Sequence, residues 1–179
     1  DDRRDLPDRQ RTLRAAIAWI AGLLPDPQRH ILRRLSLVSG GFTLAAAQEV
    51  AAGSGFAAWE VVHGLGALVQ RSLVTTGPDL VRPRHRMLQA MRDFAREQPG
   101  FAAEQPEVAR RHAEYFLGLA EAADREGDNR DRDEALAALT PEIENLRAAL
   151  CWALSPDGDA ALGAALAAAT ARFWSEIGL

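Results

Sequence analysis

The chain has 179 residues, of which 47% are hydrophobic and 26% are charged, the balance of an ordinary globular protein. All 21 basic residues are arginines and are outnumbered by 25 acidic ones, and the net charge of −4 excludes a general polyelectrolyte attraction to nucleic acid. The single cysteine predicts a protein without internal disulfides. No apolar run approaches the roughly 20 residues of a membrane span, and the N-terminus lacks a signal-peptide core. We therefore predict a cytoplasmic protein without membrane contact.

Four helices are predicted in the first 70 residues, because apolar residues recur there at three- and four-residue steps. Pro25 ends the first helix, and glycine-rich breaks follow the second and the third. Asp26, placed before Pro27, and Thr43 are N-cap signals. The predicted helices cover residues 12–24, 26 to the break at 39–41, 43–52 and 57–70.

The period of the sequence changes after residue 70. Residues 72–76 are rich in β-forming side chains, Gly77-Pro78-Asp79 predicts a turn, and Leu80-Val81-Arg82 begins a return strand. A hairpin this short is marginal unless it packs on helices. Helices followed by such a hairpin have the order of a winged helix, and we place this domain over residues 1–100.

From Met87 the apolar residues again recur at helical spacing, and Pro99-Gly100 ends this predicted helix. The remaining helices are predicted over 106–126, within 134–139, from the start signal at 140–142 to residue 154, and from Asp159 onward. Their alanine-rich faces allow close approach, as in paired-helix repeats. We therefore predict a mainly α fold: a winged helix, then an antiparallel helical segment over 101–179 that begins a tetratricopeptide-like array. An open apolar face near Leu179 predicts that the natural chain continues.

Several segments in matching order resemble the winged-helix region of bacterial STAND regulators, the NB-ARC ATPases. The resemblance covers nearly the whole chain, over residues 6–19, 32–44, 65–74, 86–95, 110–116 and 144–154. The last two segments are similar to the helices that lead into the tetratricopeptide-like repeats of the family. The alanine-rich, lysine-free composition is typical of a GC-rich genome, such as an actinobacterial one.

The resemblance implies a longer parent protein with an ATP- and ADP-binding core upstream, further repeats downstream and an output domain at one terminus. In the family, the winged helix packs on the nucleotide-binding core and helps to close the ADP site. This chain has no lysine and therefore no Gly-rich phosphate loop of the usual kind, so we assign no cofactor to the chain itself.

Relatives in that family often carry Met-His-Asp at the start of the helix after the hairpin, where the histidine reaches the ADP β-phosphate. Met87-Leu88-Gln89 stands at the matching position, and leucine cannot donate a hydrogen bond to phosphate. The resemblance therefore implies either that this sensor is absent or that its work passes to His85 or Arg86, our candidate cofactor-binding residues.

Four potential cations surround Pro83 on the wing: Arg82, Arg84, His85 and Arg86. They predict contacts to the phosphates of a nucleotide or of DNA or to an acidic face within the same protein, or else they form a solvated strand end. The helix over 57–70 would enter a major groove, but it carries Glu60 and has no arginine before Arg71. Direct DNA binding by this chain is therefore not the favoured prediction.

No catalytic constellation emerges from the sequence, and we expect no enzyme. The histidines lack metal-ligand spacing and are expected at the surface or at helix ends: His30, His63, His85 and His112. The tryptophans each neighbour an apolar face and are expected in the core: Trp19, Trp59, Trp152 and Trp174. Cys151 is likewise expected to be a small buried hydrophobe.

The resulting hypothesis is a regulatory fragment that couples the nucleotide state of an upstream ATPase core to the binding of an unknown protein or small-molecule inducer. Its partners would be the upstream nucleotide-binding domain and the downstream repeats. The alternative is a stand-alone winged-helix DNA-binding regulator with a helical effector or dimerisation domain. A purely structural adaptor is a third hypothesis.

Overall fold

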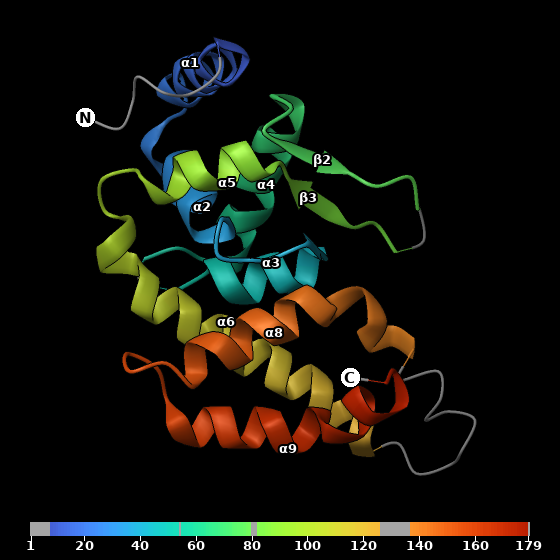
Figure 1. The fold of residues 1–179 in the computed structure, drawn as a ribbon. Helices are drawn as coiled ribbons and strands as arrows, with labels where there is room; N and C mark the ends of the chain where they lie inside the picture. The colour runs from blue at the N-terminus through green and yellow to red at the C-terminus, as the bar shows by residue number, and fades with distance from the viewer. Residues whose placement is uncertain (1–7, 54, 80–81, 126–136, 179) are drawn as a thin grey trace.

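The computed structural model describes residues 8–53, 55–79, 82–125 and 137–178 (Figure 1). The fold is mainly helical with one small antiparallel sheet, so the predicted winged helix followed by a helical segment is confirmed. The winged helix fills the upper part of Figure 1 and the helical segment the lower part. In the described part of the chain, no helix is long and apolar enough to cross a membrane.

The first half contains five helices and three strands among the described residues. They are α1 (Asp8–Gly22), α2 (Asp26–Leu35), β1 (Gly41–Phe42), α3 (Leu44–Ala51), α4 (Ala58–Gln70), β2 (Val74–Thr76), β3 (His85–Met87) and α5 (Gln89–Arg96). The Thr43 cap is confirmed, because its hydroxyl accepts a hydrogen bond from Ala46 N at 3.1 Å. Asp26 is the first residue of α2 and not its cap, which is Pro25.

The sheet corrects the predicted hairpin. Its strand order is β1-β3-β2, so β3 is central and bonds to a neighbour on each side. Arg82 was predicted in the return strand, but the strand begins at His85; Leu80 and Val81 lie outside the described residues. Pro83 has no N–H to donate to a ladder, so a central strand begins beyond it. The two-residue β1 was predicted only as a break.

The second half contains α6 (Phe101–Arg125), a 3₁₀ turn η1 (Thr140–Glu142), α8 (Ile143–Ala153) and α9 (Ala160–Glu176). The α6 helix starts five residues before the predicted start, and Pro106 lies inside it. The Asp159 cap is confirmed by bonds from Ala161 N at 3.0 Å and Leu162 N at 3.1 Å. Residues 137–139 are helical, and the rest of the predicted 134–139 helix lies outside the described residues.

One continuous core joins the two halves. Helix α6 packs against α2 and α3 on one side and against α8 and α9 on the other, as Figure 1 shows. Phe42 of β1 and Phe116 of α6 are both fully buried in this core. The division into two domains at residue 100 stays a prediction.

Several expected core side chains lie at the surface instead. Trp19 is 69% exposed and Trp59 is 64% exposed, because α1 and α4 bury only the opposite faces of their helices. Cys151 is exposed as well, while Trp152 and Trp174 are half-buried. The prediction of core positions was therefore wrong for Trp19, Trp59 and Cys151.

Candidate functional site

The helix-turn-helix is formed by α3 and α4 and the tight turn between them. Gly53 and Gly55 both have positive φ, 97° and 92°, a conformation that favours glycine. Gly53 and Phe56 exchange two backbone hydrogen bonds of 2.9 Å across the turn. The turn therefore sets the direction in which α4 leaves α3.

Arg34 of α2 binds the backbone of this turn with its buried guanidinium. Its Nη1 lies 3.0 to 3.2 Å from the carbonyl oxygens of Ala51, Ala52 and Gly53. The last carbonyl groups of a helix have no partner within the helix, so these contacts satisfy the C-terminal end of α3. Its guanidinium carbon lies 5.4 Å from the ring centroid of Phe56, a cation–π contact. Because Arg34 is only 3% exposed, we infer that it positions the start of α4 and is not a surface cation.

The carboxylate of Glu104, on α6 of the helical segment, contacts Arg34 and two further residues of α2. Its carboxylate lies 2.6 Å from Arg33 Nη2, 3.4 Å from Arg34 Nε and 2.9 Å from His30 Nδ1. This cluster was not predicted from the sequence, because all 21 basic residues are arginines and no local signal distinguishes Arg33 and Arg34 from the others. No local pattern could have paired residues 71 positions apart.

The outer face of α4 presents few charges. Trp59 is 64% exposed and Val62 is 37% exposed, and His63 stacks edge-on against Trp59 with ring centroids 5.9 Å apart. The Glu60 carboxylate accepts a hydrogen bond from Ala57 N at 2.7 Å and so caps the helix start. Helix α4 itself contains no arginine. Arg71 follows its C-terminal end, and the Arg71 Nη1 donates to Ala67 O at 3.3 Å.

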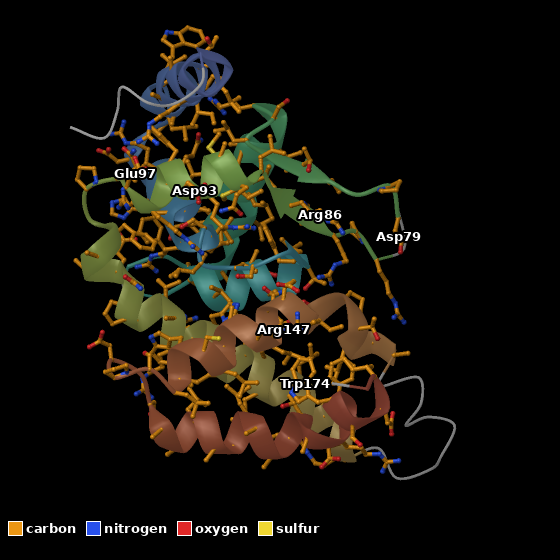
Figure 2. All side chains as sticks on the ribbon, viewed as in Figure 1. Asp79, Arg86, Asp93, Glu97, Arg147 and Trp174 are labelled. Carbon is orange, nitrogen blue, oxygen red and sulfur yellow. The ribbon has the colours of Figure 1, made fainter. Side chains whose placement is uncertain are left out.

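Two of the four predicted wing cations point outward. Arg82 and Arg86 are exposed, and Figure 2 shows Arg86 at the base of the wing and Asp79 towards its tip. The backbone of Arg82 donates to Asp79 Oδ1 at 3.0 Å. Together with Arg71, these side chains are the exposed arginines next to the wing and α4 in the described residues. The predicted phosphate contacts of Arg82 and Arg86 stay predictions.

His85 points back towards the sheet. Its Nδ1 lies 3.2 Å from Thr76 Oγ1, and its ring centroid is 5.7 Å from that of Phe42. Burial lowers the pKa of His85 below its usual value, so the imidazole is mainly neutral near pH 7. A neutral imidazole supplies a hydrogen bond but no charge to a phosphate, and its predicted nucleotide contact stays a prediction.

Arg84 turns inward to a buried polar junction between the wing and α8. Its guanidinium pairs with the Glu142 carboxylate and donates to Gly41 O at 2.7 Å and Pro141 O at 3.1 Å. Asn145 Nδ2 donates to the same Gly41 oxygen at 3.0 Å and to Glu142 Oε2 at 2.7 Å. A phosphate contact by Arg84 would have to break these bonds.

His112 of α6 lies next to this junction. It was expected at the surface or at a helix end, but it is only 3% exposed. Burial lowers the pKa of His112 to about 4, although Asn145 lies close enough to favour the protonated form. Neither His112 Nε2 nor Asn145 Oδ1 has a partner of good hydrogen-bond geometry. The imidazole is therefore neutral near pH 7.

Met87-Leu88-Gln89, the segment that was aligned with the histidine sensor of STAND regulators, forms the end of a strand and the start of a helix. Met87 is the last residue of β3, and Leu88, which is 59% exposed, is the N-cap residue of α5. Gln89 Nε2 donates to Asp93 Oδ1 at 2.7 Å, and Arg92 Nη1 donates to Gln89 Oε1 at 2.9 Å. In the described part of the chain, no group of three or more histidines, cysteines and carboxylates converges as a metal site would require.

Comparisons with known proteins agree with this architecture. Residues 24–99, which hold α2 to α5 and the wing, match the family described as a winged helix-turn-helix domain. A protein of Mycobacterium tuberculosis (strain H37Rv) named "Putative HTH-type transcriptional regulator Rv0890c" is 40% identical over 144 residues, which are 80% of this chain and 16% of that protein. No solved structure matches the chain.

Two further mycobacterial proteins are also similar to part of this chain. A Mycobacterium bovis protein named "Putative HTH-type transcriptional regulator Mb0914c" has the same identity and coverage. "Uncharacterized protein Rv0894" of M. tuberculosis is 30% identical over 108 residues, 60% of this chain and 28% of that protein. The chain thus spans 16% of the length of the relatives named as regulators. These names agree better with the alternative hypothesis of a winged-helix regulator than with an ATPase fragment.

Proposed function

We propose that this chain is a winged-helix unit of a transcriptional regulator, and that the outer face of α4 contacts protein and does not read DNA bases. The observation that carries this proposal is the α4 face itself, which presents Trp59 and Val62 and has no arginine before Arg71. Exposed aromatic side chains are enriched at protein interfaces, whereas phosphate contacts by cations supply most of the affinity for DNA.

The two polar clusters support a regulatory role for the helical segment. Glu104 ties α6 to the arginines that fasten the helix-turn-helix, and Glu142 ties the start of α8 to Arg84 of the wing. A change in the position of the helical segment would therefore be transmitted to both the turn before α4 and the wing. This arrangement suits a module in which one part relays a signal to the other.

The resemblance to STAND regulators adds a finer hypothesis within the same proposal. In a longer parent protein, the winged helix would respond to an upstream core that binds ATP or ADP, and downstream repeats would bind a protein or small-molecule inducer. The supporting fact is that the named relatives are about six times longer than the matched region, which leaves room for such parts. Limited proteolysis of the full-length parent with ADP and with ATP tests it: identical cleavage near residues 98–105 would contradict it.

The second candidate function is direct DNA binding. It is favoured by the three exposed arginines at the wing and at the end of α4, and by the names of the relatives. If all three neutralised phosphates, the logarithm of affinity would fall with the logarithm of salt concentration with a slope of about −2.7.

Titration of the purified chain with labelled mixed-sequence duplex DNA separates the two candidates. We expect no measurable binding at low or at near-physiological salt. Tight binding that weakens with a slope near −2.7, is lost in the double variant Arg82→Gln/Arg86→Gln and is kept in Arg147→Gln would overturn the proposal. The Arg147 side chain is exposed on α8, away from the wing (Figure 2), which makes it a matched control.

A further inference from the structure

A cavity lies at the junction of the winged helix and the helical segment. Its volume is about 340 Å³, within the range of small-molecule sites. Its walls come from the segment after α2, from α5, from the first turns of α6 and from α8. The residues that carry the argument are Leu37, Arg96, Phe101, His112, Cys151 and Trp152.

The lining combines an apolar body with a single charged group. Phe101 and Trp152 supply aromatic surface from two different helices, and Leu37 adds an aliphatic side chain. Arg96 is the only charged side chain among the described lining residues, and arginine stays protonated in proteins. The cavity therefore offers one permanent positive charge and no carboxylate in its lining, while Asp93, one turn earlier on α5 and outside the lining, interacts electrostatically with Arg96.

Arg96 is held in place and retains free donors. Its Nε and Nη2 donate to Ser36 O at 3.1 and 2.7 Å, which orients the planar guanidinium. Among the described residues, no acceptor is hydrogen-bonded to its Nη1. A guanidinium fixed by one edge and open at another is suited to bind a carboxylate.

His112 adds a buried polar atom to the same lining. Its Nε2 is shielded from water and has no hydrogen-bond partner of good geometry, which is costly in a folded protein. His112 also interacts with Asn145, so it connects the cavity wall to the polar junction between the wing and α8. Because the imidazole is neutral near pH 7, it contributes polarity to the cavity but no charge.

From these features we infer that the cavity binds a small aromatic monocarboxylate, with its ring against Phe101 and Trp152 and its carboxylate on Arg96. The inference goes beyond the proposed function and does not depend on it, because binding is measured directly on this chain. Since the walls belong to both halves of the fold, a bound ligand stabilises their association by mass action.

Cys151 provides the assay, because it is the only cysteine of the chain and lies at this cavity. The rate of its alkylation by N-ethylmaleimide is measured with indole-3-acetate, with the neutral indole-3-acetamide and with acetate. We expect indole-3-acetate to slow alkylation about tenfold at ten times its Kd, as one-site protection requires. The amide and acetate are expected to protect less at the same concentration. Isothermal titration calorimetry supplies a second measurement of binding.

Variants connect the effect to the cavity. Ala148→Leu adds side-chain volume inside the cavity and is expected to abolish both the protection and the heat of binding. Arg96→Met is expected to remove the preference for the acid over the amide, and Arg147→Gln, outside the lining, to leave both unchanged. The proposal is overturned if indole-3-acetate gives neither heat nor protection at millimolar concentration. It is also overturned if folded Ala148→Leu binds like the parent chain.

Discussion

Replacing Arg84 by methionine tests whether the wing and α8 are joined energetically. Removing one partner of a buried ion pair typically costs about 3–5 kcal/mol, because the other charge stays buried and uncompensated. The Glu142 side chain is 7% exposed, but that of Arg84 is 22% exposed, and Asn145 would still donate to Glu142. We therefore expect Arg84→Met to lower the free energy of unfolding by about 2–3 kcal/mol.

The assay is urea unfolding followed by circular dichroism, in a double-mutant cycle with Glu142→Leu. Residues that share a hydrogen-bond network couple by 0.5–3 kcal/mol in general, and we expect a coupling energy of about 1–2 kcal/mol here. The control is Arg147→Met, which removes an exposed pair with Glu144 and should cost less than about 0.5 kcal/mol. Equal costs for Arg84→Met and Arg147→Met, or a coupling energy near zero, would refute the reasoning.

Three further predictions concern packing, exposure and pH. Gly64→Ala places a Cβ 2.2 Å from Ile31 Cδ1 and should cost about 1–3 kcal/mol in urea unfolding, whereas Gly66→Ala has open space and should be neutral or stabilising. Trp59→Ser should change the free energy of unfolding by less than about 0.5 kcal/mol, because the side chain is 64% exposed; a larger loss would contradict the described α4 face. The folded pKa of His112, about 4, lies below the unfolded value of 6.5, so the unfolded state binds a proton first as the pH falls. Stability should therefore be lost between pH 6.5 and 4, and His112→Gln should show a shallower loss in unfolding measured across that range.

Elements with local signals could be predicted from the amino-acid sequence. Apolar residues at three- and four-residue steps located α2 to α4, and Thr43 and Asp159 marked helix starts through bonds to amides two or three residues away. The order of helices and hairpin was enough to predict a winged helix followed by a helical segment. Helix caps and apolar periodicity depend only on residues a few positions apart, so a short stretch of sequence is sufficient to predict them.

Which side chains are buried, paired or exposed at the wing and on α4 depends on how distant elements pack together. The sequence around Pro83 marked four potential cations without distinguishing which would stay exposed, and the position of α8 places Arg84 beside a carboxylate 58 residues away. The central position of β3 depends likewise on β1 pairing with its free edge. The exposure of the Trp59 side chain depends on which face of α4 packs against the other helices. Asn145 meets Gly41 across 104 residues of chain, a contact that arises only when α8 docks beside β1. Burial and pairing are properties of the packed surfaces, and no local spacing encodes them.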